Sequence, residues 1–158
     1  MPGLEDLYRE IILDHYRSPR NRGELAPPAA HAVGHNPLCG DEIDVYLQIE
    51  DSPDGPIVAD IKVGGQGCSI SQSSASMMSQ AVKGRPVDHV RSMVRRFEAM
   101  LGIEHDDTRD DNSDEALAEV KLGDIEALQG VAKFPVRIKC ATLAWYTLLD
   151  ALSQAATE

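Results

Sequence analysis

The chain has 158 residues, of which 42% are hydrophobic and only 4% aromatic, so its size and composition fit one soluble globular domain with an aliphatic core. Fifteen Lys and Arg against 26 Asp and Glu give a formal net charge of -11, which argues against binding to the phosphate backbone of nucleic acid. No run of about 18 apolar residues occurs, and the N-terminus lacks the apolar core of a secretion signal, so we expect no membrane span and a cytoplasmic protein.

The first half of the chain is predicted to form a helix followed by a small sheet. Apolar residues at three- and four-residue steps predict a helix over residues 4–16. An irregular, proline-containing stretch follows, with one short strand near residues 32–35. Alternating apolar residues over 43–50 and β-branched residues over 57–63, separated by a turn sequence at 52–55, predict a β-hairpin.

The second half is predicted to be helical. Helical spacing covers residues 69–83 and continues, after a glycine, over residues 86–102. Residues 104–115 contain seven acids and one Arg and are predicted to be a flexible surface loop. A short helical piece near residues 125–128 precedes a long helix over 134–152. We therefore expect a single α+β domain over the whole chain, in which helices pack on one face of an antiparallel sheet of about three strands.

Three cysteines carry the chemistry that can be read from the residues. Their odd number and wide separation argue against a disulfide framework and leave metal binding, nucleophilic chemistry or simple burial. Cys39 lies in a turn sequence together with Asp41. Cys68 follows a glycine-rich turn at a helix start, and Cys140 lies near the start of the last helix, so both are placed where negative charge is favoured.

The residues alone leave the metal hypothesis open. Zinc takes four ligands, and three cysteines with Asp41 supply that number. However, none of the cysteines forms the short Cys-x-x-Cys spacing of a recognisable zinc site, and free cysteines are often merely buried. His35 is the only histidine near this group in sequence and is a weaker alternative ligand.

A resemblance to a known family supports the metal hypothesis. The chain resembles the SufU branch of the IscU/NifU N-terminal family through motifs that occur in family order along nearly its whole length. These are LYRE (7–10), DHY (14–16), PRN (19–21), NPLCGD (36–41), GCSIS (67–71) and RIKCA (137–141). The IscU-type scaffolds carry a histidine directly before the third cysteine, whereas Lys139 stands there in this chain, and residues 123–134 resemble an insertion of the zinc-binding branch.

The resemblance implies an SufU/IscU-like α+β fold and a role in iron–sulfur cluster assembly. It implies that Cys39, Asp41, Cys68 and Cys140 together bind Zn²⁺. It also implies that the partner is a pyridoxal-phosphate-dependent cysteine desulfurase, from which Cys39 accepts persulfide sulfur once its bond to the metal is exchanged. Downstream cluster-assembly proteins would receive the sulfur, and Arg137 is a supporting residue that would orient Asp41 or attract the persulfide.

Two alternatives remain beside this sulfurtransferase. The same four ligands suit a labile [2Fe–2S] cluster, in which case the protein is a scaffold for cluster assembly. The metal could instead only stabilise the fold of a non-catalytic adaptor. In the leading hypothesis the protein acts as a sulfur acceptor and desulfurase activator rather than as a stand-alone enzyme.

Overall fold

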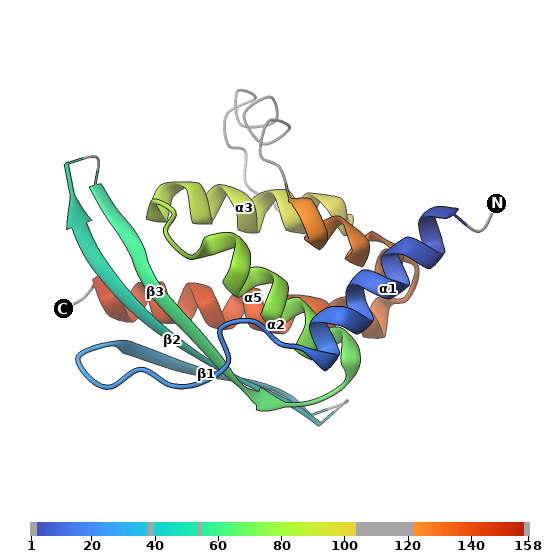
Figure 1. The fold of residues 1–158 in the computed structure, drawn as a ribbon, viewed down its shortest axis with the longest axis horizontal. Coiled ribbons are helices and arrows are strands. Elements are labelled where there is room, and N and C mark those ends of the chain that lie inside the picture. Colours follow the sequence, from blue (N-terminus) through green and yellow to red (C-terminus); the bar gives the residue numbers. More distant parts are fainter. Residues whose placement is uncertain (1–2, 38–39, 54, 104–121, 157–158) are drawn as a thin grey trace.

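The computed structural model describes residues 3–37, 40–53, 55–103 and 122–156, so the predicted acidic loop lies outside the described residues. Figure 1 shows the order of the elements along the chain. They are α1 (Gly3–Arg17), β1 (Ala30–Asn36), β2 (Asp41–Ser52), β3 (Gly55–Gln66), α2 (Ser69–Val82), α3 (Val87–Met100), the 3₁₀ helix η1 (Gly123–Lys133) and α5 (Pro135–Ala156).

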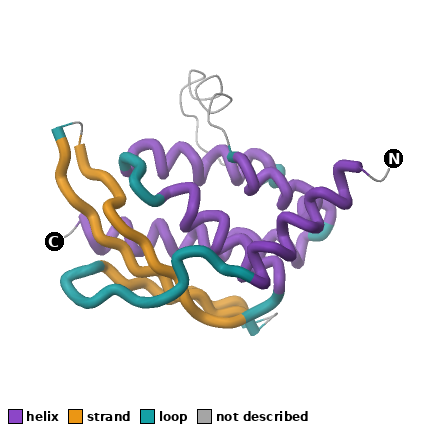
Figure 2. Tube along the Cα trace, viewed as in Figure 1, coloured by secondary structure: helices purple, strands orange, loops and turns teal. Residues whose placement is uncertain are grey.

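The sheet is antiparallel in the order β1-β2-β3, and helices pack on one of its faces. Side chains alternate between the two faces of a strand, so Ile43, Val45 and Leu47 of β2 share the buried face. Helix α5 packs across β1 and β2, and α2 packs on α5. Figure 2 shows the strands gathered along one side of the molecule and the helices along the other. The predicted α+β architecture is confirmed.

The centre of the helical layer is built around one tryptophan. Trp145 of α5 is fully buried and stacks on Phe97 of α3, with ring centroids 4.6 Å apart. Its Nε1–H donates to Ser74 Oγ at 3.0 Å, and the Ser74 hydroxyl donates to the carbonyl of Ala141 at 2.6 Å. The small serine thus lets α2 and α5 approach closely while every polar atom of this contact is paired.

The element before the last helix differs from its prediction. The expected short helical piece at 125–128 is part of a longer 3₁₀ helix, η1. Ile125, Leu128 and Val131 are all buried and follow one another at steps of three residues. This spacing matches the three residues per turn of a 3₁₀ helix, so the three side chains form one apolar row.

A buried histidine joins α1 to α2 and η1. His15 is 0% exposed. Its ring nitrogens lie 2.8 Å from Ser76 Oγ and 3.0 Å from Asp124 Oδ2. Because a carboxylate can only accept, Nε2–H donates to Asp124, while Nδ1 lies within hydrogen-bond distance of the Ser76 hydroxyl, whose oxygen also accepts the backbone N–H of Arg20. One polar network therefore ties the end of α1 to α2 and η1.

We predict that His15→Phe lowers the free energy of unfolding by about 2–4 kcal/mol, because it removes both hydrogen bonds and leaves Ser76 and Asp124 without this partner. Urea unfolding followed by circular dichroism measures the change. The substitution Tyr16→Phe at the neighbouring position is the control. Tyr16 is 45% exposed, so removing its hydroxyl should lower the free energy of unfolding by less than about 0.5 kcal/mol. Equal stability of the two variants would contradict the assigned role of the network.

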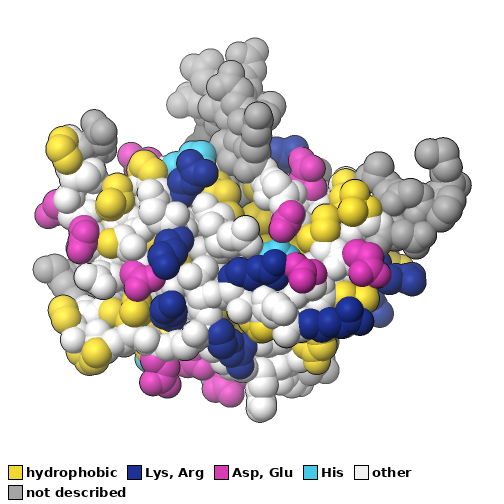
Figure 3. Space-filling model, viewed as in Figure 1, with side chains coloured by type: hydrophobic (Ala, Val, Ile, Leu, Met, Phe, Trp, Pro, Cys, Tyr) yellow, Lys and Arg dark blue, Asp and Glu magenta, His cyan; other side chains and the backbone are white. Residues whose placement is uncertain are grey.

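One face of the molecule carries charges of both signs despite the acidic composition. Figure 3 shows Lys and Arg side chains across the middle of one face, with Asp and Glu between and around them. Within the described ranges, no helix is long and apolar enough to cross a bilayer.

Candidate metal site

Asp41 reaches the interior because of the alternation of β2. It is the first residue of the strand and shares the buried face with Ile43 and Val45, so it is only 2% exposed. A carboxylate at this depth requires polar partners. Its Oδ1 accepts the backbone N–H of Cys68 at 2.9 Å, while Oδ2 lies 3.9 Å from Cys68 Sγ. One oxygen is thus anchored to the backbone and the other faces a sulfur atom.

Cys68 is the N-terminal capping residue of α2. Its backbone is extended (φ -73, ψ 168), and its side chain forms no capping hydrogen bond. The unpaired N–H groups of a helix N-terminus favour negative charge at this position. The half-buried thiol lies 3.8 Å from Ser71 Oγ, whose hydroxyl donates to the Cys68 carbonyl at 3.1 Å. The prediction that Cys68 stands at a helix start is confirmed.

Cys140 lies in the second turn of α5 and is 2% exposed. Asn36, the last residue of β1, directs its Nδ2 toward Cys140 Sγ at 3.8 Å. The carbonyl of Val136, one helical turn earlier, lies 3.8 Å from the same sulfur. The sulfur therefore stands between the end of the sheet and the start of the last helix.

Side chains from three distant parts of the chain converge here. One ligand atom each from Asp41, Cys68 and Cys140 lies within 4.8 Å of the others. Two sulfur ligands 2.3 Å from one zinc ion at a tetrahedral angle stand about 3.8 Å apart, so a modest closing of the group is enough to bind an ion. Two sulfur atoms and a buried carboxylate, one oxygen of which is held by the Cys68 N–H, form a set of donor atoms that suits Zn²⁺ and also iron.

The other predicted site residues are placed as follows. Cys39 lies outside the described residues. Arg137 is exposed on the first turn of α5, with its guanidinium carbon 5.5 Å from the ring centroid of Phe134, and the structure gives it no contact with Asp41. His35 is exposed on β1 and does not belong to the ligand group formed by the described residues.

Sequence reasoning missed the role of Asn36. The predicted strand near residues 32–35 stops short of Asn36, yet Asn36 is the last residue of β1, is 7% exposed and pairs in register with Asp41. Ala30 and Ala32 are buried on the same strand, and alternation from them reaches residue 36. That alternation was the signal that could have placed Asn36 on the inner face, beside the ligands.

Comparisons of the sequence with known proteins identify similar proteins over most of the chain. Residues 7–141 match the family described as NifU-like N terminal domain. The chain is 49% identical over 146 residues to the "zinc-dependent sulfurtransferase SufU" of Bacillus subtilis, which covers 92% of this chain and 88% of the relative. It is 37% identical to the "iron-sulfur cluster assembly scaffold protein IscU" of Thermotoga maritima, over 94% of either chain.

Solved structures show the same fold. A SUF-system cluster-assembly scaffold from Fervidobacterium islandicum superposes with a TM-score of 0.73 at 29% identity, over 95% of this chain and 99% of that one. An N-terminal NifU-like protein from Brucella abortus, at 24% identity, gives a TM-score of 0.77 over 98% of this chain and 97% of that one, and supports the fold alone.

Proposed function

The chain belongs to the family of NifU-like N-terminal domains, and we propose that within it this protein is a zinc-dependent sulfur acceptor in iron–sulfur cluster assembly. The observation that carries the proposal is the convergence of Asp41, Cys68 and Cys140 within 4.8 Å, in a chain that is 49% identical to a zinc-dependent sulfurtransferase. The sulfur donor in this proposal is the persulfide of a pyridoxal-phosphate-dependent cysteine desulfurase, and downstream assembly proteins are the recipients. This chemistry requires cysteines that stay reduced, and the cytoplasm is a reducing compartment in which thiols do so.

The proposed metal ligands are Cys39, Asp41, Cys68 and Cys140. When bound, zinc supplies thiolate stabilisation without redox chemistry. The protein contributes the arrangement: the Cys68 N–H fixes one oxygen of Asp41, and the burial of Asp41 and Cys140 excludes water. Cys39 is two residues before Asp41 in the chain, so the backbone between them spans at most about 7 Å. Chain connectivity thus supports Cys39 as the fourth ligand.

Cys39 is the proposed acceptor. Its thiolate attacks the outer sulfur of the desulfurase persulfide, the S–S bond breaks, and the desulfurase cysteine leaves as a thiolate while a persulfide forms on Cys39. The exchange conserves electrons and needs no further oxidant or reductant. Arg137, exposed at the start of α5, is proposed to attract the incoming anionic persulfide.

A second function, assembly of a labile [2Fe–2S] cluster on the same ligands, is favoured by the 37% identity to an IscU scaffold. A third, an adaptor whose metal is only structural, would use the same residues without sulfur chemistry.

Metal content and persulfide loading distinguish these three functions. We expect protein purified without air to be colourless with one zinc per chain, and desulfurase with cysteine to load one labelled sulfur onto it. Brown protein containing iron and sulfide would instead establish the scaffold, and zinc protein that never acquires persulfide would establish the adaptor.

Replacing Asn36 tests the support of the metal ligands. We predict that Asn36→Leu weakens zinc retention about 10- to 100-fold, the usual effect of losing a hydrogen bond to a ligand, because the amide no longer donates to Cys140 Sγ. Competition with a chromogenic chelator measures the affinity. Val33→Leu, on an exposed position of the same strand, is the control. Unchanged zinc affinity in Asn36→Leu would show that the contact is incidental.

A further inference from the structure

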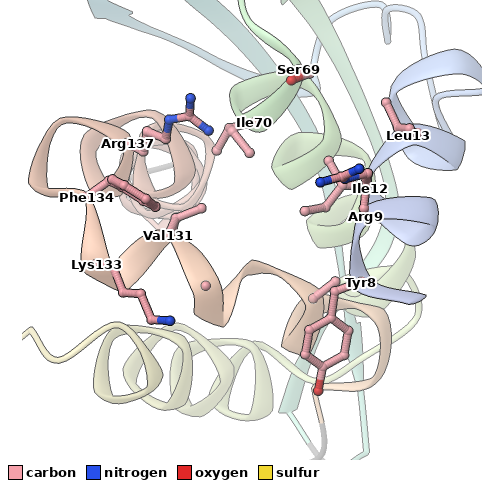
Figure 4. A pocket seen from close by; sticks show the side chains of 12 residues that line it. Tyr8, Arg9, Ile12, Leu13, Ser69, Ile70, Val131, Lys133, Phe134 and Arg137 are labelled. Carbon is pink, nitrogen blue, oxygen red and sulfur yellow. The ribbon is translucent and has the colours of Figure 1, made fainter. Parts of the chain in front are cut away.

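A cavity of about 640 Å³ borders the start of α2, directly after Cys68 in the chain. It lies between α1, the start of α2, η1 and the start of α5, and Figure 4 shows side chains from these elements around a common hollow. The apolar part of its wall includes Ile12, Ile70, Val131 and Phe134. A volume of this size lies in the range of pockets that bind small molecules.

The charge of the cavity is opposite to that of the chain. Arg9, Lys133 and Arg137 line it, and no Asp or Glu does, although the whole protein carries a net charge of -11. None of these three cations forms an ion pair with another described residue. Three positive charges that have no ion pair among the described side chains, placed around an apolar wall, favour an anionic ligand with a nonpolar part.

The position of the cavity connects it to sulfur chemistry. Ser69 and Ile70 line it and directly follow Cys68 in the chain. On the opposite side, Arg137 lies one helical turn before Cys140. A ligand in the cavity therefore lies next to the elements that hold the sulfur ligands.

We propose that this cavity binds a low-molecular-weight thiol that carries carboxylates, and that this thiol is a direct acceptor of the sulfur. The inference rests on the proposed function, because it requires a persulfide on the protein. The bound thiolate attacks the outer sulfur of the Cys39 persulfide, the S–S bond breaks, and the Cys39 thiolate is regenerated while the small molecule leaves as a persulfide. Arg9 and Lys133 hold the carboxylates, and the apolar wall packs against the carbon chain.

Binding is tested first without any sulfur transfer. The probe is S-methylglutathione, whose sulfur is blocked and whose two carboxylates remain. We expect saturable chemical-shift changes in the zinc-loaded protein at residues 8–13 and 130–137, and at least about a tenfold weaker affinity in the double variant Arg9→Gln/Lys133→Gln. Arg17→Gln, an exposed cation on α1 that does not line the cavity, is the matched control and should bind like the unmodified protein. Absence of saturable binding, or equal loss in the control, overturns the proposal.

Transfer is tested on protein already loaded with labelled persulfide and separated from the desulfurase. We expect the transfer rate to saturate with increasing glutathione and to rise linearly with 2-mercaptoethanol, which has no carboxylate. The double variant should lose saturation with glutathione and keep its rate with 2-mercaptoethanol.

The possible outcomes separate the two proposals. If the protein cannot be loaded, the proposed function itself fails. If it loads but both thiols react linearly, only the cavity proposal fails. If the double variant instead loses loading by the desulfurase, the cavity is a docking surface for that protein, and the small-thiol proposal is wrong.

Discussion

Replacing Cys39 by alanine is expected to abolish sulfur acceptance while the protein stays folded. The variant lacks the proposed acceptor sulfur, so desulfurase-dependent persulfide should fall by roughly three orders of magnitude or more, as when other nucleophiles are deleted. The fold should survive because residue 39 belongs to the connection between β1 and β2, whereas the described core is built from the sheet and the helices. Mass spectrometry of alkylated peptides after incubation with desulfurase and cysteine measures the loading.

Ser71→Ala provides the comparison for this experiment. Its hydroxyl lies 3.8 Å from Cys68 Sγ but supplies no sulfur, so this variant should still accept persulfide. Thermal unfolding of both variants checks that they are folded. Normal loading of Cys39→Ala, with the label on Cys68 or Cys140, would show that the acceptor is assigned to the wrong cysteine.

Replacing Gly67 by alanine is expected to release the metal although every proposed ligand remains. A Cβ at this position would lie 2.7 Å from Ser71 Oγ and closer still to Asp41 Oδ1, nearer than packed atoms can approach. Asp41 must then move away from the Cys68 N–H that anchors it. Because displacement of a ligand by its surroundings typically costs 10- to 100-fold in metal affinity, we expect a loss of about that size.

Gly64→Ala is the matched control, three residues earlier in the same glycine-rich sequence and within β3. Its nearest neighbour would be the Asp44 Cβ at 3.8 Å, an ordinary contact, so zinc affinity should not change. Chelator competition and the visible spectrum after Co²⁺ substitution report affinity and ligand geometry separately. Equal zinc affinity in the Gly67 and Gly64 variants would contradict the proposed placement of Asp41.

The regular elements could be predicted from the sequence because their signals are local. The alternation of β2 and the three- and four-residue steps of α2 and α3 are complete within each segment. For η1, the same local pattern predicted too short a helix. Apolar side chains at steps of three residues continue beyond the predicted residues 125–128. Over so few residues, the three-residue period of a 3₁₀ helix is hard to distinguish from the 3.6-residue period of an α-helix.

The candidate site was predicted only in part, because its geometry depends on contacts between remote segments. The family motifs identified Asp41, Cys68 and Cys140, but spacing alone could not show that they meet. The anchoring of Asp41 by the Cys68 N–H and the approach of Asn36 to Cys140 require the folded sheet and α5. The cationic cavity was not foreseen either, since Arg9 of α1 and Lys133 of η1 are far apart in the sequence and come together only by packing.

The origin of the site in both halves of the chain has a consequence during synthesis by the ribosome. A nascent chain that has emerged only as far as α3 possesses Asp41 and Cys68 but still lacks Cys140. Full coordination must wait until α5 has left the exit tunnel and docked on β1 and β2. On the proposed ligand set, metal binding after that point links the start of β2 to α5 and stabilises the complete chain over truncated products.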